Sequence, residues 1–223
     1  MITSLIIAAH PDDEILGCGG TIKKLSSEED FYVLILTYGV ENRYPKEMET
    51  RLKENARKAN KLVGTKEVFF ENLPNQGLDA IPILDVITTI EKYMSQIKPD
   101  RVFTHHGGDL NRDHRVVHEA SMVATRPISG QCAKQVYSYH VASSTEWNQI
   151  KEEDIFIPNV FIDISDTISA KIGAMKCYSS ECRPFPHPRS PEALEVYSQY
   201  WGITVGMKNV EIFRLIRDLR GSL

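Results

Sequence analysis

The sequence predicts a single-domain α/β protein, spanning residues 1–223, with a Rossmann-like, doubly wound and mostly parallel sheet flanked by helices. Three observations support this fold class. The chain is long enough for one well-filled core, and its composition of 42% hydrophobic and 25% charged residues is ordinary for a globular protein. The first four predicted strands are almost continuously apolar, which is typical of parallel strands buried on both faces. Helical segments separate these strands, which indicates βαβ units with right-handed crossovers.

The individual elements follow from residue type and spacing. Runs of β-branched and aromatic residues predict strands at 4–8, 31–37, 67–70, 101–104, 135–140 and 159–164. Helical spacing and end signals, such as Gly64 after the second helix and Pro82 at the start of the third, predict the helices. They cover residues 14–27, 46–63, 81–97, 114–125, 166–176 and 192–201. The proline-rich segment 183–191 predicts a loop.

Composition also limits the classes of partner. The net charge is −4 and no basic stripe stands out, which argues against a nucleic-acid partner. No apolar run is long enough to cross a bilayer, and the N-terminus lacks the pattern of a secretory signal. We therefore expect a cytoplasmic protein that binds neither membrane nor nucleic acid, while a homo-oligomer is compatible with the sequence.

Two segments rich in potential metal ligands follow predicted strands about a hundred residues apart. The first is A-H-P-D-D-E at 9–14, and the second is H-H-G-G-D-L-N-R-D-H at 105–114. Because the carboxyl ends of parallel strands meet at one edge of a sheet, both segments should converge there, together with the loop at 38–43. Imidazoles and carboxylates at this density predict a metal site.

Helix capping is the alternative explanation for the paired aspartates Asp12 and Asp13. Capping accounts for one aspartate, but crowded like charges are costly unless a cation neutralises them. His114 is the natural partner of His10 and one aspartate, because two histidines and one carboxylate suit catalytic zinc and also non-haem iron. His118, one helical turn later, is an alternative ligand, although packing is its simpler explanation.

The segment H-P-D-D-E at 10–14, taken with Asp113 and His114, resembles the LmbE/PIG-L family of metal-dependent deacetylases. Members of this family remove an N-acetyl group from glucosamine-containing substrates. The likeness includes an R-x-x-E pattern at Arg51 and Glu54 and extends through most of the chain. The segments at 143–147 and 186–190 look like those of a subgroup of the family.

The resemblance implies a division of roles. His10, Asp13 and His114 are the expected metal ligands, with zinc as the expected ion and Fe²⁺ or another divalent ion as the alternative. Asp12 is the expected general base, which takes a proton from the water that attacks the acetamide carbonyl. Asp113 is expected to orient an imidazole.

The chain departs from the family at Asn111, where many members carry the first histidine of an H-x-x-H motif. Asparagine can donate a hydrogen bond but cannot deliver a proton to a leaving amine. The acid role then falls to His105, His106 or His140, with His140 preferred because it ends a strand that points at the same crevice. The alternatives are Asp12, acting as base and then acid, and Asn111 as a hydrogen-bond donor to the oxyanion.

Substrate contacts are expected from polar side chains around this crevice and from loops contributed by the chain from about residue 141. The candidates are Arg43, Arg51, His105, His106, His187 and Arg189. The sequence therefore predicts a zinc-dependent hydrolase that removes the N-acetyl group from a small-molecule N-acetylated amino sugar or its conjugate. The alternatives are a non-catalytic module that binds metal or a sugar nucleotide, and an amidase acting on a related thiol-precursor conjugate.

Overall fold

The computed structural model describes residues 1–37, 47–128, 133–148 and 151–221. Over these residues the strands are β1 (Ile2–Ala8), β2 (Glu29–Ile35), β3 (Glu67–Phe70), β4 (Arg101–His105), β5 (Gln135–Tyr139), β6 (Val160–Asp163) and β7 (Val210–Asp218). They form one seven-stranded sheet in the order β3-β2-β1-β4-β5-β7-β6. Strands β1 to β5 run parallel, so the predicted mostly parallel sheet is confirmed.

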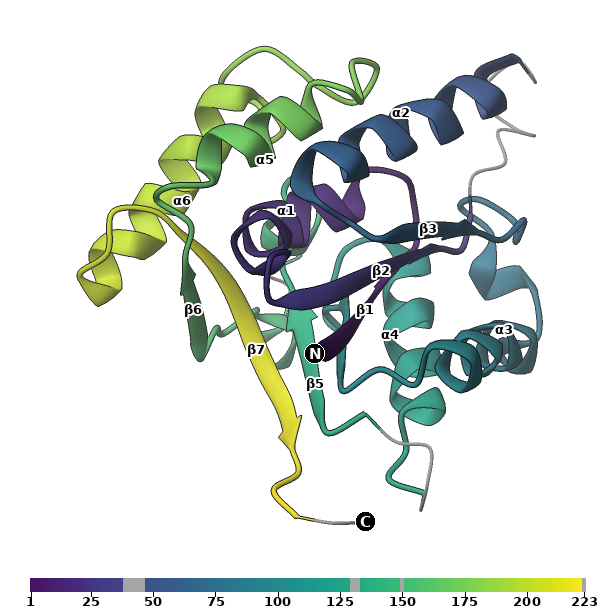
Figure 1. The fold of residues 1–223 in the computed structure, drawn as a ribbon. Helices are drawn as coiled ribbons and strands as arrows, with labels where there is room; N and C mark the ends of the chain where they lie inside the picture. The colour runs from purple at the N-terminus through teal and green to yellow at the C-terminus, as the bar shows by residue number, and fades with distance from the viewer. Residues whose placement is uncertain (38–46, 129–132, 149–150, 222–223) are drawn as a thin grey trace.

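Helices cover both faces of the sheet, as a doubly wound fold requires (Figure 1). One core lies between the sheet and α1 (Asp13–Leu25), α2 (Glu47–Val63), α5 (Ile168–Met175) and α6 (Pro191–Val205). The other core lies beneath α3 (Ile83–Ile97) and α4 (Arg112–Ala124). Short 3₁₀ turns cover Leu78–Ala80, Thr145–Trp147 and Glu152–Asp154. Among the helices that the structure describes, none has the length and apolar character needed to cross a bilayer.

The far edge of the sheet departs from the prediction. Strand β7 pairs antiparallel with β5 on one side and with β6 on the other. No strand was predicted at its position, because Glu211, Arg214 and Arg217 interrupt the apolar residues of this segment. The additional strand brings the carboxylate of Glu211 against α1, where it is buried.

Two glycines let α1 lie close to the sheet. A Cβ atom at Gly17 would overlap the ring of Tyr139, and one at Gly20 would lie 2.8 Å from a methyl carbon of Ile164. Because neither neighbour is the free end of an exposed side chain, a larger residue would push α1 away from the sheet. The glycines therefore fix how closely the middle of α1 approaches Tyr139 and Ile164.

The strand order reverses between β1 and β4, and this reversal positions the site. The chain leaves β1 to form α1 on one face, whereas it leaves β4 to form α4 on the other face (Figure 1). Ligand sites of open α/β sheets lie in the crevice that such a divergence opens at the carboxyl ends of the strands. Both ligand-rich segments of the sequence lie at this point.

Candidate metal centre

Three side chains from the two ligand-rich segments meet beside the ends of β1 and β4. The atoms His10 Nδ1, Asp13 Oδ2 and His114 Nε2 lie 3.3 Å from one another in all three pairs. Ligands placed about 2.0–2.1 Å from a tetrahedral zinc ion are about 3.3–3.4 Å apart. The three atoms therefore fit around one ion of this size without movement of the side chains. These are the three ligands expected from the sequence.

Each imidazole has a carboxylate on the side away from the shared centre. His10 Nε2 lies 2.9 Å from Asp113 Oδ2, and His114 Nδ1 lies 3.2 Å from Asp109 Oδ1. Such carboxylates fix the tautomer, so that the other ring nitrogen presents its lone pair. Asp113 is held in turn by the backbone N–H groups of Gln76 and Leu78, at 2.7 Å and 3.0 Å. Asp113 thus occupies the position expected of a residue that orients an imidazole.

Asp109 joins the centre to the loop that follows β5. It is fully buried and accepts hydrogen bonds from the Ser144 hydroxyl, from Thr145 Oγ1 at 2.5 Å and from the backbone N–H of Asn111 at 2.8 Å. Sequence reasoning gave Asp109 no role, although it stands five residues before His114 within the second ligand-rich segment. Its hydroxyl partners come from the loop that the resemblance singled out at 143–147.

The charges of the cluster stabilise one another. Burial alone would raise the pKa of Asp13, but His114 and His105 hold that pKa well below its usual range. Burial alone would lower the pKa of His114, but Asp13 and Asp109 raise it to about 10. A proton and a divalent ion therefore compete for the ring of His114, since only the neutral imidazole can bind a metal.

Asp12 is buried and has a strained backbone. Its φ of 112° lies in the left-handed region that residues with a Cβ rarely adopt, at a cost of about 1–3 kcal/mol. Its side chain makes no capping hydrogen bond to α1, so capping does not explain this aspartate. Instead, Asp12 Oδ2 accepts a hydrogen bond of 2.8 Å from Arg189 Nη1. Burial raises the pKa of Asp12 to about 8, although Arg189 acts to lower it.

Arg189 was expected to contact substrate, but the structure gives it protein partners. Besides Asp12, its Nη1 lies 3.4 Å from Glu181 Oε2, and its Nε donates to Ser143 Oγ at 2.8 Å. The contact with Asp12 joins residues 177 positions apart in the chain. No spacing signal in the sequence could have paired them.

Asn111 was expected to take part in catalysis, and the structure gives it a structural role as well. It is the N-cap of α4, where its side chain accepts a hydrogen bond of 2.9 Å from the backbone N–H of Asp113. A signal for this role was present, because asparagine is among the preferred N-cap residues. The predicted start at His114 placed the helix two residues too late for Asn111 to be recognised as its cap.

His105 lies beneath the cluster and does not face a substrate. It is fully buried, and its ring stacks on that of His114 with 3.9 Å between centroids. Its Nε2 accepts a hydrogen bond of 2.9 Å from the backbone N–H of Ala9, so this lone pair is already used. His105 was expected to contact substrate, but its side chain has no exposed surface in this structure and instead supports the ring of His114.

His106 and His187 contact other parts of the protein. His106 Nε2 lies 2.9 Å from the carbonyl oxygen of Asp154. His187 Nδ1 accepts a hydrogen bond of 3.1 Å from the backbone N–H of Arg189, and its ring meets Trp147 edge-on. His187 therefore shapes the loop that carries Arg189.

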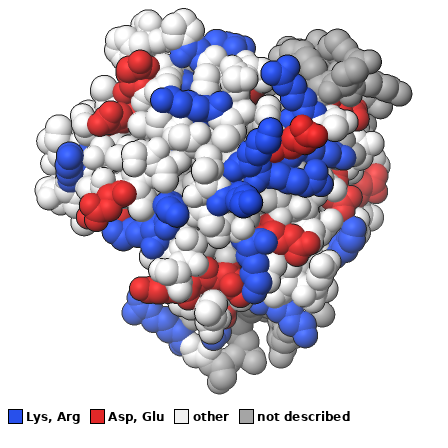
Figure 2. Space-filling model, turned by 45° about the horizontal axis from the view of Figure 1, so that its top comes forward, with Lys and Arg blue, Asp and Glu red and all other residues white. Residues whose placement is uncertain are grey.

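Of the two arginines of the N-terminal half that were expected to contact substrate, the structure describes Arg51. Arg51 and Glu54 are both exposed on α2. Arg43 and the loop at 38–43 lie outside the described residues. On the face drawn in Figure 2, basic and acidic side chains are interspersed.

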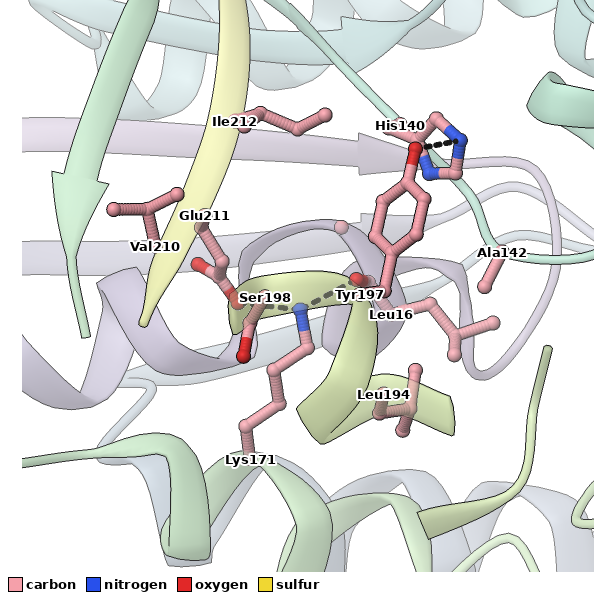
Figure 3. Close-up of a pocket in the computed structure, with 11 residues that line it drawn as sticks. Leu16, His140, Ala142, Lys171, Leu194, Tyr197, Ser198, Val210, Glu211 and Ile212 are labelled. Carbon is pink, nitrogen blue, oxygen red and sulfur yellow. Dashed lines mark hydrogen bonds and ion pairs between the residues drawn. The ribbon is translucent and has the colours of Figure 1, made fainter. Parts of the chain in front are cut away.

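His140 lies in a separate cavity, shown in Figure 3. Its Nε2 lies 2.9 Å from the hydroxyl of Tyr197 and 3.5 Å from Glu146 Oε2. Burial lowers the pKa of His140 to about 3, so the ring is neutral at pH 7. The cavity is also lined by Leu16 of α1 and by the buried pair of Lys171 and Glu211. A neutral imidazole in this setting is a hydrogen-bond partner and a poor acid.

Comparisons with known proteins find relatives over most of the chain. Residues 5–125 match the model of a family described as PIG-L: GlcNAc-PI de-N-acetylase. The uncharacterized deacetylase YaiS of Escherichia coli (strain K12) is 30% identical over 189 residues, which cover 79% of this chain and 90% of the relative. The diacetylchitobiose deacetylase of Thermococcus kodakarensis is 26% identical over 226 residues, which cover 95% of this chain and 82% of the relative.

A solved structure with a different activity has the same architecture. The 4-carboxy-2-hydroxymuconate hydratase GalB of Pseudomonas putida KT2440 superposes with a TM-score of 0.76 and covers 100% of this chain and 99% of its own. At 18% sequence identity this likeness shows the fold alone. The reaction must therefore be argued from the residues of the site.

Proposed function

The chain belongs to the PIG-L family, and from this premise we propose that it removes the N-acetyl group from an N-acetylated amino sugar, using a divalent ion held by His10, Asp13 and His114. The family is described as a de-N-acetylase, and both relatives are deacetylases. The observation that carries the proposal is the uniform 3.3 Å spacing of the three ligand atoms. Two imidazoles and one carboxylate are the ligand set of catalytic zinc sites, and zinc is the ion we expect.

The residues of the centre can carry out an amide hydrolysis. When bound, the ion would supply positive charge that polarises the acetamide carbonyl and favours ionisation of a water molecule. Asp12, the neighbour of the ligand Asp13, accepts a proton from the attacking water. The hydroxyl of that water adds to the carbonyl carbon at the same time. The C–N bond then breaks, and the products are acetate and the free amine.

The leaving amine must receive a proton, and Asp12 is the group best placed to return one. Asn111 is committed to the cap of α4 and has no proton to give. His105 is fully buried beneath His114, and His140 is neutral and hydrogen-bonded to Tyr197. Arg189 favours the ionised form of Asp12 that takes the proton of water, whereas burial favours the protonated form that returns it to the amine.

The first test is acetate release. We would load the purified protein with zinc and incubate it with N-acetylglucosamine, N,N′-diacetylchitobiose and an N-acetylglucosamine nucleotide. We expect acetate from at least one substrate, loss of that activity with a chelator and its return when zinc is restored. Zinc binding without acetate release from any of them would instead support the non-catalytic binding module.

The second test separates the two neighbouring aspartates. Asp12→Asn should keep wild-type zinc content but lower kcat by about a hundred- to ten-thousand-fold, because an amide cannot accept the proton of water. Asp13→Asn should lower the zinc content itself, because it removes the charged ligand. Elemental analysis and acetate assays of both variants decide the roles. Near wild-type turnover in Asp12→Asn at full zinc occupancy would exclude Asp12 as the base.

A further inference from the structure

We propose that Arg189 is a positioning residue that holds the carboxylate of Asp12 in its working orientation. The inference rests on the proposed function, in which Asp12 is the base. It assigns to the proline-rich loop before α6 a part in the active site, although this loop is far in sequence from the metal ligands. Sequence reasoning gave Arg189 a different role, that of a substrate ligand.

The carboxylate of Asp12 depends on Arg189 for its hydrogen bonding. Its Oδ2 lies 2.8 Å from Arg189 Nη1, and no other side chain of the described residues donates to this carboxylate. The adjoining residues Asp13 and Glu14 are also buried acids, so three carboxyl groups are crowded together at the start of α1. Arg189 is therefore the cation that offsets crowding among these carboxylates and draws Asp12 to one side.

Arg189 is itself fixed by several protein groups. Its Nε donates to Ser143 Oγ at 2.8 Å and lies 3.4 Å from the carbonyl oxygen of Ala142. Its Nη1 also faces Glu181 at 3.4 Å. A planar guanidinium that is held at two of its edges cannot rotate, so it holds the carboxylate of Asp12 in one position.

These contacts favour a positioning role over substrate binding. Nε and Nη1 are already engaged by protein acceptors, and the side chain is only 20% exposed. The guanidinium also faces two carboxylates, Asp12 and Glu181, which reduce its attraction for an anionic substrate. A residue of this kind should act on kcat through Asp12 and leave substrate affinity nearly unchanged.

The chain offers a matched control in the same loop. Arg183 is exposed, and its Nη1 donates to the backbone carbonyl oxygens of Ser180 and Cys182. Arg183→Ala thus removes the same side chain from the same segment without touching Asp12. We expect its activity, zinc content and thermal stability to equal those of the wild type.

The kinetic test compares Arg189→Ala and Arg189→Lys with the wild type and Arg183→Ala. The substrate is N-acetylglucosamine or N,N′-diacetylchitobiose, whichever the wild type deacetylates faster. Arg189→Ala should keep its zinc and lower kcat by roughly a hundred-fold with KM within about threefold, the scale expected for a misplaced catalytic group. Arg189→Lys keeps the charge and should recover part of kcat even if the alanine variant folds poorly. Added guanidinium ion should partly restore Arg189→Ala.

A binding measurement provides a readout other than turnover. In the Asp12→Asn background, calorimetric affinity for the same sugar should be equal with arginine or alanine at position 189. A tenfold or greater loss of affinity would make Arg189 a substrate ligand and overturn the proposal. Wild-type kcat in zinc-loaded Arg189→Ala would also overturn it. A wild-type protein that releases no acetate would refute the proposed function itself, and the positioning role with it.

Discussion

Asp12 combines a buried carboxylate with a backbone conformation that an aspartate does not readily adopt. The left-handed φ of 112° directs its side chain away from the N-terminus of α1, where it would otherwise act as a cap, and towards Arg189. Strain of this kind persists only where the surrounding structure enforces it, and it concentrates at functional sites. The neighbour Asp13 instead turns to His10 and His114. Two identical side chains in sequence thus acquire different roles through backbone geometry.

The strain at Asp12 predicts an ordering of stability between two inactive variants. Asp12→Gly and Asp12→Ala both remove the carboxylate, so Arg189 loses the same hydrogen-bond acceptor in each variant. Glycine adopts positive φ without a Cβ clash, so Asp12→Gly should be more stable than Asp12→Ala by about 1 kcal/mol. This difference already includes the greater conformational entropy that glycine has in the unfolded chain. Urea unfolding of both metal-free variants measures this difference. An alanine variant as stable as the glycine variant would show that position 12 is unstrained.

The raised pKa of His114 predicts that zinc binding depends on pH. With a pKa of about 10, His114 is protonated at neutral pH in the metal-free protein and must lose that proton to bind the ion. Zinc affinity should therefore increase about tenfold per pH unit for each proton displaced, between pH 6 and 8. Chelator competition measures the slope, and calorimetry in buffers of different ionisation enthalpy measures the proton release. A slope of zero would contradict the assigned charge state.

The same shift affects the stability of the metal-free protein. The folded-state pKa of His114 lies above its unfolded value of 6.5, so the folded state binds this proton more tightly. The resulting stabilisation is fully present below about pH 6.5 and is lost as pH rises through about 10. Bound zinc should remove the loss of stability between about pH 6.5 and 10, because the ring is then neutral in both states. Below about pH 6.5 the zinc-bound protein should instead lose stability, because only the unfolded ring takes up a proton.

At the scale of single elements, α1 is held by polar groups as well as by apolar packing. In its first turn, the carboxylate of Glu14 accepts hydrogen bonds from Tyr178 at 2.5 Å and from Asn60 at 2.8 Å. Further along, Glu211 of β7 accepts from the backbone N–H groups of Gly20 and Thr21, both at 2.7 Å. These ties join the helix that carries Asp13 to α2 and to the C-terminal half of the chain.

The buried pair of Lys171 and Glu211 should be important for stability. Lys171 Nζ donates to Glu211 at 2.7 Å and to the carbonyl oxygen of Leu16 at 2.7 Å (Figure 3). Lys171→Met leaves Glu211 buried with an uncompensated charge, which should cost about 3–5 kcal/mol of unfolding free energy. Lys66→Met, which breaks an exposed pair with Asp30, is the control and should change stability little. Equal urea midpoints for the two variants would contradict the assigned importance of the buried pair.

At the scale of the whole molecule, the metal centre joins two βα units on opposite faces of the sheet. His10 lies in the turn between β1 and α1, and Asp13 begins α1, whereas His114 belongs to α4. This convergence could be predicted from the sequence, because continuous apolar strands indicate a parallel sheet and parallel strands end at one edge. The fold class and the convergence of the two ligand-rich segments followed from that argument, whereas the choice of Asp13 over Asp12 as the ligand came from the family resemblance.

Other features could not be predicted because they depend on contacts between distant segments. The contact of Asp12 with Arg189 requires knowing where a proline-rich loop lies, and loops without periodicity leave no such signal. The burial of His105 at the end of β4 depends on the ring of His114, which comes from α4 and stacks on it. Strand β7 was missed because its charged residues find partners only after the sheet and α1 have come together.

The central claim is that His10, Asp13 and His114 bind one divalent ion, and a crystal structure of the zinc-loaded protein with anomalous scattering tests it most directly. The result we predict is one zinc ion per chain, with His10 Nδ1, Asp13 Oδ2 and His114 Nε2 about 2.0–2.2 Å away. Zinc bound elsewhere, or bound through His118 in place of His114, would contradict the account.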